Sequence, residues 1–208
     1  MFRFSVALAL LPAFAMGHAV VTQPVLRQPG AASLAACGSA VEAKLKSDPT
    51  GPLTGVVPPR QIENSVKAID STTTTDCALY QCRGYKAGPS APLAPPLFED
   101  NADNVATYSP GDVVNFHVDL VAHHTGFANI SVIDLAADAP LARLFTWPVY
   151  ANSNLGPADW PANETNFNVT IPDLGGVCAE AGACAIQWWW YATENGQTYE
   201  SCVDFVGA

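Results

Sequence analysis

Basic side chains are scarce in this 208-residue sequence, which has 9 Lys and Arg against 19 Asp and Glu and a net charge of −10 at pH 7. Nucleic acids and anionic membranes attract basic surfaces, so this balance excludes both as expected partners. A neutral polymer such as a polysaccharide is not repelled by the acidic charge. The same charge also helps to keep a protein in solution.

The sequence also lacks an apolar run long enough to span a bilayer. The longest candidate, residues 6–11, follows Arg3 and is followed by small residues at Ala15 and Gly17, a pattern typical of a secretory signal peptide. We therefore expect a signal peptide at residues 1–17 and cleavage before His18. The mature protein, residues 18–208, is expected to be a secreted, extracellular single domain.

Familiar hydrolase motifs are missing. The sequence contains no Gly-x-Ser-x-Gly, no His-Glu-x-x-His and no clear pair of glycosidase carboxylates. These absences argue against serine hydrolase, zinc protease and glycosidase chemistry.

Six cysteines are present, all in the expected mature part. An even number in an exported chain predicts three disulfides. Cys178 and Cys184 lie close together across Gly182 and are expected to pair locally. Three connectivities remain for the other four cysteines. The pairs that we favour are Cys82–Cys202 and Cys37–Cys77.

Three glycosylation sequons begin at Asn129, Asn163 and Asn168. We expect the latter two to be the exposed ones and the protein to be a glycoprotein.

The apolar pattern predicts a mainly β protein. After a short first strand at His18, the clearest segments are residues 114–124, 128–135, 145–150, 165–171, 185–192 and 198–205. One helix is predicted over residues 33–46 with Ser33 as a possible cap, and a shorter one around residues 61–69. Short strands with Gly and Pro turns favour a two-sheet sandwich, with a long loop-and-short-helix insertion after the first strand.

A metal site is suggested by the four histidines, His18, His117, His123 and His124. A cleaved terminus at His18 offers an amine and an imidazole to one ion with little loss of chain entropy. His124 ends the apolar row of its strand at the sheet rim, whereas the alternation turns His123 away and His117 points outward. A buried histidine bonded to backbone is the alternative for His124. Nitrogen donors without thiolate favour copper, with zinc as the competitor.

Three stretches of the sequence carry a family resemblance. They are HAVVTQPVLRQPG from His18, AHHTG from Ala122, and QWWWY from Gln187 together with the tail QTYESCVDF. They resemble fungal lytic polysaccharide monooxygenases, and more narrowly secreted proteins with a type-4 chitin-binding domain. The resemblance covers essentially the whole mature chain.

The resemblance implies an immunoglobulin/fibronectin-III-like β-sandwich that holds one copper ion in a histidine brace. By position, the metal ligands would be the amine and ring of His18 and the ring of His124. Tyr199 would lie on one axial side of the ion and Ala122 on the other. These residues, His18, His124 and Tyr199, form the expected catalytic centre.

The same resemblance implies oxidative cleavage of an insoluble polysaccharide, chitin or a related glucan, by a monomer that takes electrons from an external donor. Gln187 and Glu194 are candidates for a polar residue beside the metal. Tyr80, Tyr85 and Trp160 are candidates for contacts with substrate. A non-catalytic secreted protein that binds copper or the cell wall is the alternative function.

Overall fold

The computed structural model describes residues 18–47, 49–51, 53–54, 77–80, 82, 84–87, 98–137 and 139–208. The expected signal peptide at residues 1–17 and the helix expected around residues 61–69 lie outside the described residues. Within the described part, no helix has the length and apolar character needed to cross a membrane.

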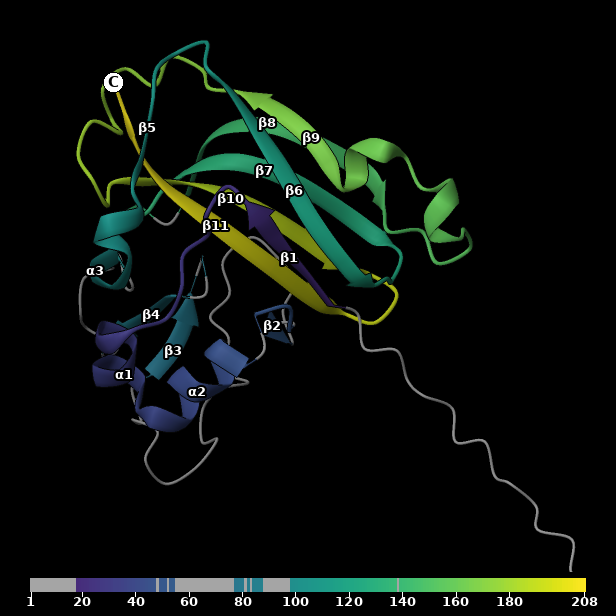
Figure 1. Cartoon of the computed structure of the whole chain (residues 1–208), viewed down its shortest axis with the longest axis horizontal. Coiled ribbons are helices and arrows are strands. Elements are labelled where there is room, and N and C mark those ends of the chain that lie inside the picture. The colour runs from purple at the N-terminus through teal and green to yellow at the C-terminus, as the bar shows by residue number, and fades with distance from the viewer. Residues whose placement is uncertain are drawn as a thin grey trace, which may run out of the picture.

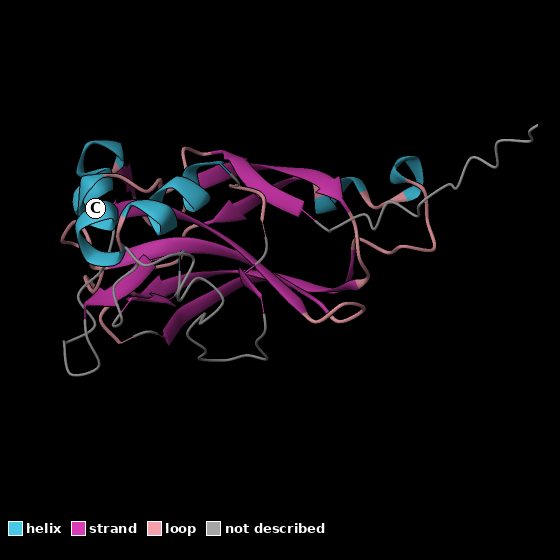
Figure 2. Ribbon diagram, turned by 90° about the horizontal axis from the view of Figure 1, so that it is seen from below, coloured by secondary structure: helices cyan, strands magenta, loops and turns pink. Residues whose placement is uncertain are grey.

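Most strands belong to two sheets that form the layers of a sandwich (Figure 1, Figure 2). The smaller sheet has the order β1-β6-β9, with β1 at His18–Gln23, β6 at Val113–Ala122 and β9 at Asn166–Thr170. The larger sheet has the order β2-β11-β10-β7-β8, and β5 pairs with β11 in parallel. Its strands are β2 (Leu53–Thr54), β5 (Ala106–Tyr108), β7 (Gly126–Asp134), β8 (Ala139–Tyr150), β10 (Cys184–Ala192) and β11 (Gln197–Gly207). This arrangement confirms the prediction of a mainly β, immunoglobulin-like sandwich.

The core lies between the two sheets. On β6 the alternation holds, because Val114, Phe116 and Val118 are buried while His117 between them is exposed. Strand β10 is different, since all of Trp188, Trp189 and Trp190 are buried. A strand that is covered on both faces has a continuous apolar sequence without alternation. The alternation pattern therefore could not show how many of these tryptophans are buried.

The segment between β1 and β6 is the expected insertion, but its helices differ from the prediction. Instead of one helix over residues 33–46 there are two, α1 (Ala31–Cys37) and α2 (Ser39–Ser47), separated by Gly38 with φ 87°. A positive φ ends a helix, which the apolar spacing could not reveal. Besides β2 and β5, the described part of the insertion contains β3 (Cys77–Tyr80), β4 (Gly84–Ala87), α3 (Phe98–Asn101) and the 3-10 turn η2 (Ala102–Asn104).

Ser33 is not the helix cap that the sequence suggested. It lies inside α1, and its Oγ donates a hydrogen bond of 2.6 Å to Asp100 in α3. Asp100 also accepts hydrogen bonds from the main-chain N–H groups of Gly30, Ala32 and Ser33. A carboxylate distant in sequence therefore satisfies the first turn of α1.

Two of the three expected disulfides are present, Cys82–Cys202 and Cys178–Cys184. The first ties the insertion to β11, and the second closes the short turn before β10. The side chains of Cys37 and Cys77 are outside the described part of the chain.

Candidate metal centre

The two segments with the candidate ligands meet at one end of the sandwich. Strand β1 runs antiparallel to β6, and His18 lies opposite Ala122 in the register. Opposed residues in such a pair have Cα atoms about 4.5–5.5 Å apart. The alternation had predicted that the strand extends to His124. Strand β6 instead ends at Ala122, so His124 lies in the connection of residues 123–125. His124 is thus two residues beyond Ala122, the residue that lies opposite His18.

His124 has an unsatisfied nitrogen. Its Nε2 is buried and has no hydrogen-bond partner among the described residues. A buried polar atom without a partner costs about 1–3 kcal/mol, so the native protein is expected to supply one. A neutral imidazole can provide a lone pair at this position, and a metal ion is a partner that accepts it. This nitrogen therefore fits a metal ligand, and it makes no hydrogen bond to the backbone of the described residues. The described residues contain no cluster of three or more His, Cys, Asp or Glu side chains that could hold a metal ion, and the side chain of His18 is not among those described.

The other two histidines have different surroundings. The ring of His123 packs edge-on against Trp160, with ring centroids 4.7 Å apart. His117 is exposed in the middle of β6, and its Nδ1 lies 2.7 Å from Oδ1 of Asn166. Among His117, His123 and His124, the histidines whose side chains the structure describes, only His124 therefore has a buried ring nitrogen that lacks a partner.

The residue after His124, Thr125, is held by two other segments of the chain. The main-chain N–H of Thr125 donates a 2.7 Å hydrogen bond to Oε2 of Glu194, and the main-chain N–H of Glu194 donates back to the Thr125 carbonyl at 3.1 Å. Ser153 completes the set, because its N–H donates to Oγ1 of Thr125 at 2.9 Å and its Oγ donates to Oε1 of Glu194 at 3.1 Å. We refer to Thr125, Ser153 and Glu194 as the loop clamp.

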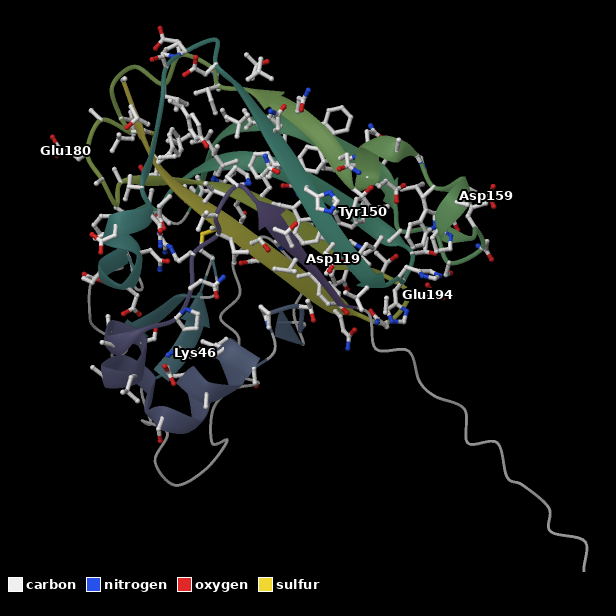
Figure 3. All side chains as sticks on the ribbon, viewed as in Figure 1. Lys46, Asp119, Tyr150, Asp159, Glu180 and Glu194 are labelled. Atoms are coloured by element: carbon white, nitrogen blue, oxygen red, sulfur yellow. A yellow bond between two sulfur atoms is a disulfide. The ribbon has the colours of Figure 1, made fainter. Side chains whose placement is uncertain are left out.

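The loop clamp lies beside the candidate ligand. Figure 3 shows Glu194 at the end of the sandwich where β1 begins and β6 ends. The pKa of Glu194 is lowered, first by the hydrogen bond from the Thr125 main chain and then by the hydrogen bond from the Ser153 hydroxyl. Glu194 therefore holds the connection that carries His124 as an ionised carboxylate.

Tyr199 comes to the same end of the molecule from β11. Its side chain is fully buried, stacks on Trp190 with ring centroids 4.4 Å apart, and donates a 2.6 Å hydrogen bond to Oε1 of Gln197. Strand β1 contacts β11, where the N–H of Val21 donates to Oγ of Ser201 at 3.1 Å (Figure 1). The beginnings of β1 and β11 are therefore adjacent.

Other candidates are placed less directly. Gln187 lies on β10 opposite Ser131, five residues or about 17 Å along β7 from Gly126, so it is not brought to His124. Tyr85 pairs with Leu79 in the β3–β4 hairpin, but the side chains of Tyr80 and Tyr85 are not among those described. Trp160 is half-buried beside His123.

Sequence reasoning missed Thr125, Gly126 and Ser153. Gly126 is required by close packing, since a Cβ there would lie 2.0 Å from the carbonyl oxygen of Tyr191. Thr125-Gly126 was visible as a turn, although not as a contact point. Ser153 carries no local signal, because its role depends on which loop the fold places next to His124.

Comparison with known families agrees with this geometry. The family described as "Lytic polysaccharide mono-oxygenase, cellulose-degrading" matches residues 18–205. The chain belongs to this family. The match confirms the resemblance found in the sequence, and members of the family are copper-dependent enzymes that act on insoluble polysaccharides. No curated protein sequence matches the chain.

Solved structures of family members are similar over most of the chain. A lytic polysaccharide monooxygenase from Jonesia denitrificans is 15% identical with a TM-score of 0.45, covering 92% of this chain and 100% of that one. One from Streptomyces lividans is 16% identical with a TM-score of 0.48, covering 91% and 99%. The catalytic domain of one from Listeria monocytogenes is 14% identical with a TM-score of 0.45, covering 92% and 99%.

Proposed function

We propose that this protein is a secreted, copper-dependent lytic polysaccharide monooxygenase that cleaves the glycosidic bonds of insoluble chitin. The observation that carries the proposal is the buried Nε2 of His124, which lacks a hydrogen-bond partner within the described chain and follows the strand paired with His18. The family match begins at His18, which supports a mature protein that starts there.

The proposed ligands of one copper ion are the α-amine and ring of His18 and the ring of His124. When bound, copper supplies the one-electron redox chemistry that activates O₂ or H₂O₂, with electrons from an external donor. Three nitrogen ligands leave positions open for an oxygen co-substrate, as a redox site requires. The amine has to lose a proton to bind, which costs little because its ordinary pKa is about 7.7–8.0.

The surrounding residues have separate tasks in this proposal. Tyr199, which stacks on Trp190, would pack beside a bound ion and help to keep water away from it, and Ala122, which lies opposite His18, would border the same site. The loop clamp fixes the connection that carries His124, as residues behind metal ligands commonly do. Trp160, beside His123, is proposed to contact the polysaccharide.

Chitin is the proposed substrate because Ala122, two residues before His124, resembles the alanine found at the corresponding position of chitin-active relatives. The description of the family names cellulose instead, so both polymers have to be assayed. Release of oxidised chito-oligosaccharides with a reductant present supports the proposal. Tight copper binding without oxidised products from either polymer would favour the alternative function, a non-catalytic secreted protein that binds copper.

The copper site is tested on the secreted protein by amino-terminal sequencing, copper stoichiometry and Cu(II) electron paramagnetic resonance (EPR). We expect a terminus at His18, one copper per chain and nitrogen hyperfine coupling. His124→Ala should abolish tight copper binding, while His117→Ala, which alters an exposed histidine in the preceding strand β6, should not. Equal loss in both variants, or a terminus elsewhere than His18, would contradict the proposed ligand set.

A further inference from the structure

The three glycosylation sequons occupy very different places in the fold. Asn129 lies on β7, which pairs on both sides, and its side chain is 8% exposed. Its Oδ1 accepts a hydrogen bond from Ser131, the third residue of the same sequon, which is 1% exposed. An oligosaccharide on Asn129 could not be accommodated without opening the sheet.

The other two sequons lie on the surface. Asn163 is exposed in the 3-10 turn η4 (Ala162–Glu164), which follows η3 (Pro157–Asp159). Asn168 is exposed on β9 and lies opposite Asn115 of β6. Both asparagines are therefore accessible in the folded protein.

Both of these sequons are at the side of the sandwich where the two sheets end. Strands β8 and β9 are the last strands of their sheets in the described chain, and they contact each other (Figure 1). A terminal strand offers unpaired backbone groups to other chains, and proteins protect such strands with proline or charge. Strand β8 carries Pro140, Arg143 and Pro148, whereas β9 has neither a charged residue nor proline.

This side also has an exposed apolar rim. Phe145 on β8 is 45% exposed and packs on Trp147, which contacts Phe167 of β9. The Nε1 of Trp147 donates a 3.1 Å hydrogen bond to the main-chain carbonyl of Asn163. The sequon at Asn163 therefore contacts the rim through Trp147, and the sequon at Asn168 lies on β9, the strand that contributes Phe167 to the rim.

We propose that Asn163 and Asn168, but not Asn129, carry N-linked oligosaccharides that cover the β8/β9 side and prevent association between copies of the protein there. The inference rests on the proposed export. In the transfer step, Nδ2 of asparagine loses a proton and bonds to C1 of the first sugar. The lipid pyrophosphate of the donor oligosaccharide leaves, so no oxidant or reductant is needed. Bulky, hydrated sugars supply the protection that β9 lacks in its own side chains.

The oligosaccharide at Asn168 would leave the metal centre open. Its partner Asn115 is seven residues before Ala122 on β6, which is roughly 23 Å along the strand. Sugars at Asn168 are thus on the flank, away from the end that carries His124.

The modification is tested by mass spectrometry of the protein secreted by a eukaryotic host. Trypsin leaves both sites in one peptide, because no Lys or Arg follows Arg143. Treatment with a peptide-N-glycosidase converts each modified Asn to Asp. A glutamate-specific protease then cleaves after Glu164 and separates the two sites. We expect conversion at Asn163 and Asn168 and none at Asn129. Unmodified Asn163 and Asn168 in protein that begins at His18 would overturn the inference, whereas a terminus elsewhere would count against the proposed export.

The protective role is tested with paired substitutions at the third position of each sequon. Thr165→Ala with Thr170→Ala removes both sequons, while Thr165→Ser with Thr170→Ser keeps them and is the matched control. We expect the alanine pair to lose both oligosaccharides and to self-associate at concentrations at which the serine pair is monomeric by light scattering. Monomeric behaviour of a folded, unglycosylated alanine pair would overturn the protective role, and copper binding should be equal in both.

Discussion

At the scale of single residues, Gly126 is important because it follows the connection that carries His124. A Cβ at this position would lie 2.0 Å from the Tyr191 carbonyl oxygen and 2.7 Å from Cα of Ala192. These are backbone atoms of the neighbouring strand, so they cannot move aside as a flexible side chain would. The close approach of β7 to the end of β10 therefore depends on glycine.

We expect Gly126→Ala to lower the free energy of unfolding by about 3 kcal/mol, since overpacking against backbone forces the strands apart. Chemical denaturation of both proteins measures the change. Gly156→Ala is the control, because its added Cβ meets only Oδ2 of Asp159 at 3.7 Å and φ is −74°. Equal destabilisation by the two substitutions would show that the contact with Tyr191 is not the cause.

A second residue of interest is Glu164, which is 2% exposed. Burial raises the pKa of its carboxyl group, partly offset by the 2.9 Å hydrogen bond from the N–H of Ala151. Below the ordinary value of 4.5 the group is protonated in both folded and unfolded chains. As the pH rises above 4.5 the unfolded chain ionises first, so the folded state loses stability until its raised pKa is passed.

Glu164→Gln should remove this loss, because an amide oxygen can accept the same hydrogen bond without ionising. We expect the stability of the variant to rise relative to the original protein as pH increases from 4.5 into the neutral range. Thermal denaturation at a series of pH values provides the measurement. A constant difference across that range would mean that Glu164 does not titrate differently on folding.

Residue-level prediction from sequence succeeded where spacing alone sets the outcome. The alternation placed Val114, Phe116 and Val118 in the core. It could not identify Glu164 as buried or Ser153 as a neighbour of Thr125, because both depend on how the loop of residues 151–165 returns to the sandwich. Contacts between residues far apart in the chain leave no local pattern.

At the scale of elements, three segments cooperate to hold His124. The connection of residues 123–125, the β10–β11 turn and the loop that follows β8 meet through the loop clamp. The proposed metal site is therefore assembled from elements that are not neighbours in sequence. Its ligand geometry depends on hydrogen bonds as well as on the sheets.

Breaking the loop clamp should weaken copper binding without unfolding the protein. We expect Glu194→Ala to lower copper affinity by about tenfold and to change the Cu(II) EPR spectrum, since residues that orient metal ligands commonly contribute that much. Glu194→Gln should retain more of the affinity, because its amide can still accept from Thr125. Isothermal titration and EPR at one pH are the measurements.

Glu180→Ala, which removes an exposed acidic residue outside the loop clamp, is the control for the change in net charge. If Glu180→Ala and Glu194→Ala weaken binding equally, long-range charge and not the loop clamp explains the effect. If the original protein itself binds no copper, the proposed function fails first. The two failures can thus be told apart.

Element boundaries were predictable where turns bound the strands. The predicted segment 185–192 differs from β10 at Cys184–Ala192 by a single residue. The helix of residues 33–46 was wrong because Gly38 adopts a positive φ, and the strand predicted through His124 ends at Ala122. In the second case the alternation of apolar residues continued to His124, although the pairing of β6 with β1 ends at Ala122.

At the scale of the whole molecule, the two disulfides constrain the chain to very different extents. Cys82 and Cys202 are 120 residues apart and join the insertion to β11, while Cys178 and Cys184 are 6 apart. In the chain-entropy description, a cross-link stabilises by restricting the unfolded chain, and more so for a longer closed segment. The corresponding contributions are about 5 kcal/mol for the long segment and about 2 kcal/mol for the short one.

We therefore expect Cys82→Ala with Cys202→Ala to destabilise the protein by more than Cys178→Ala with Cys184→Ala. Chemical denaturation under non-reducing conditions measures both double variants against the original protein. The order should hold because both cystines are buried in the folded state, so each double variant also loses a similar amount of apolar packing. If the two double variants were equally stable, the insertion would have to be held on β11 by its other contacts, such as the hydrogen bond from the N–H of Cys82 to Glu200. The disulfide would then be secondary to them in fastening that part of the chain.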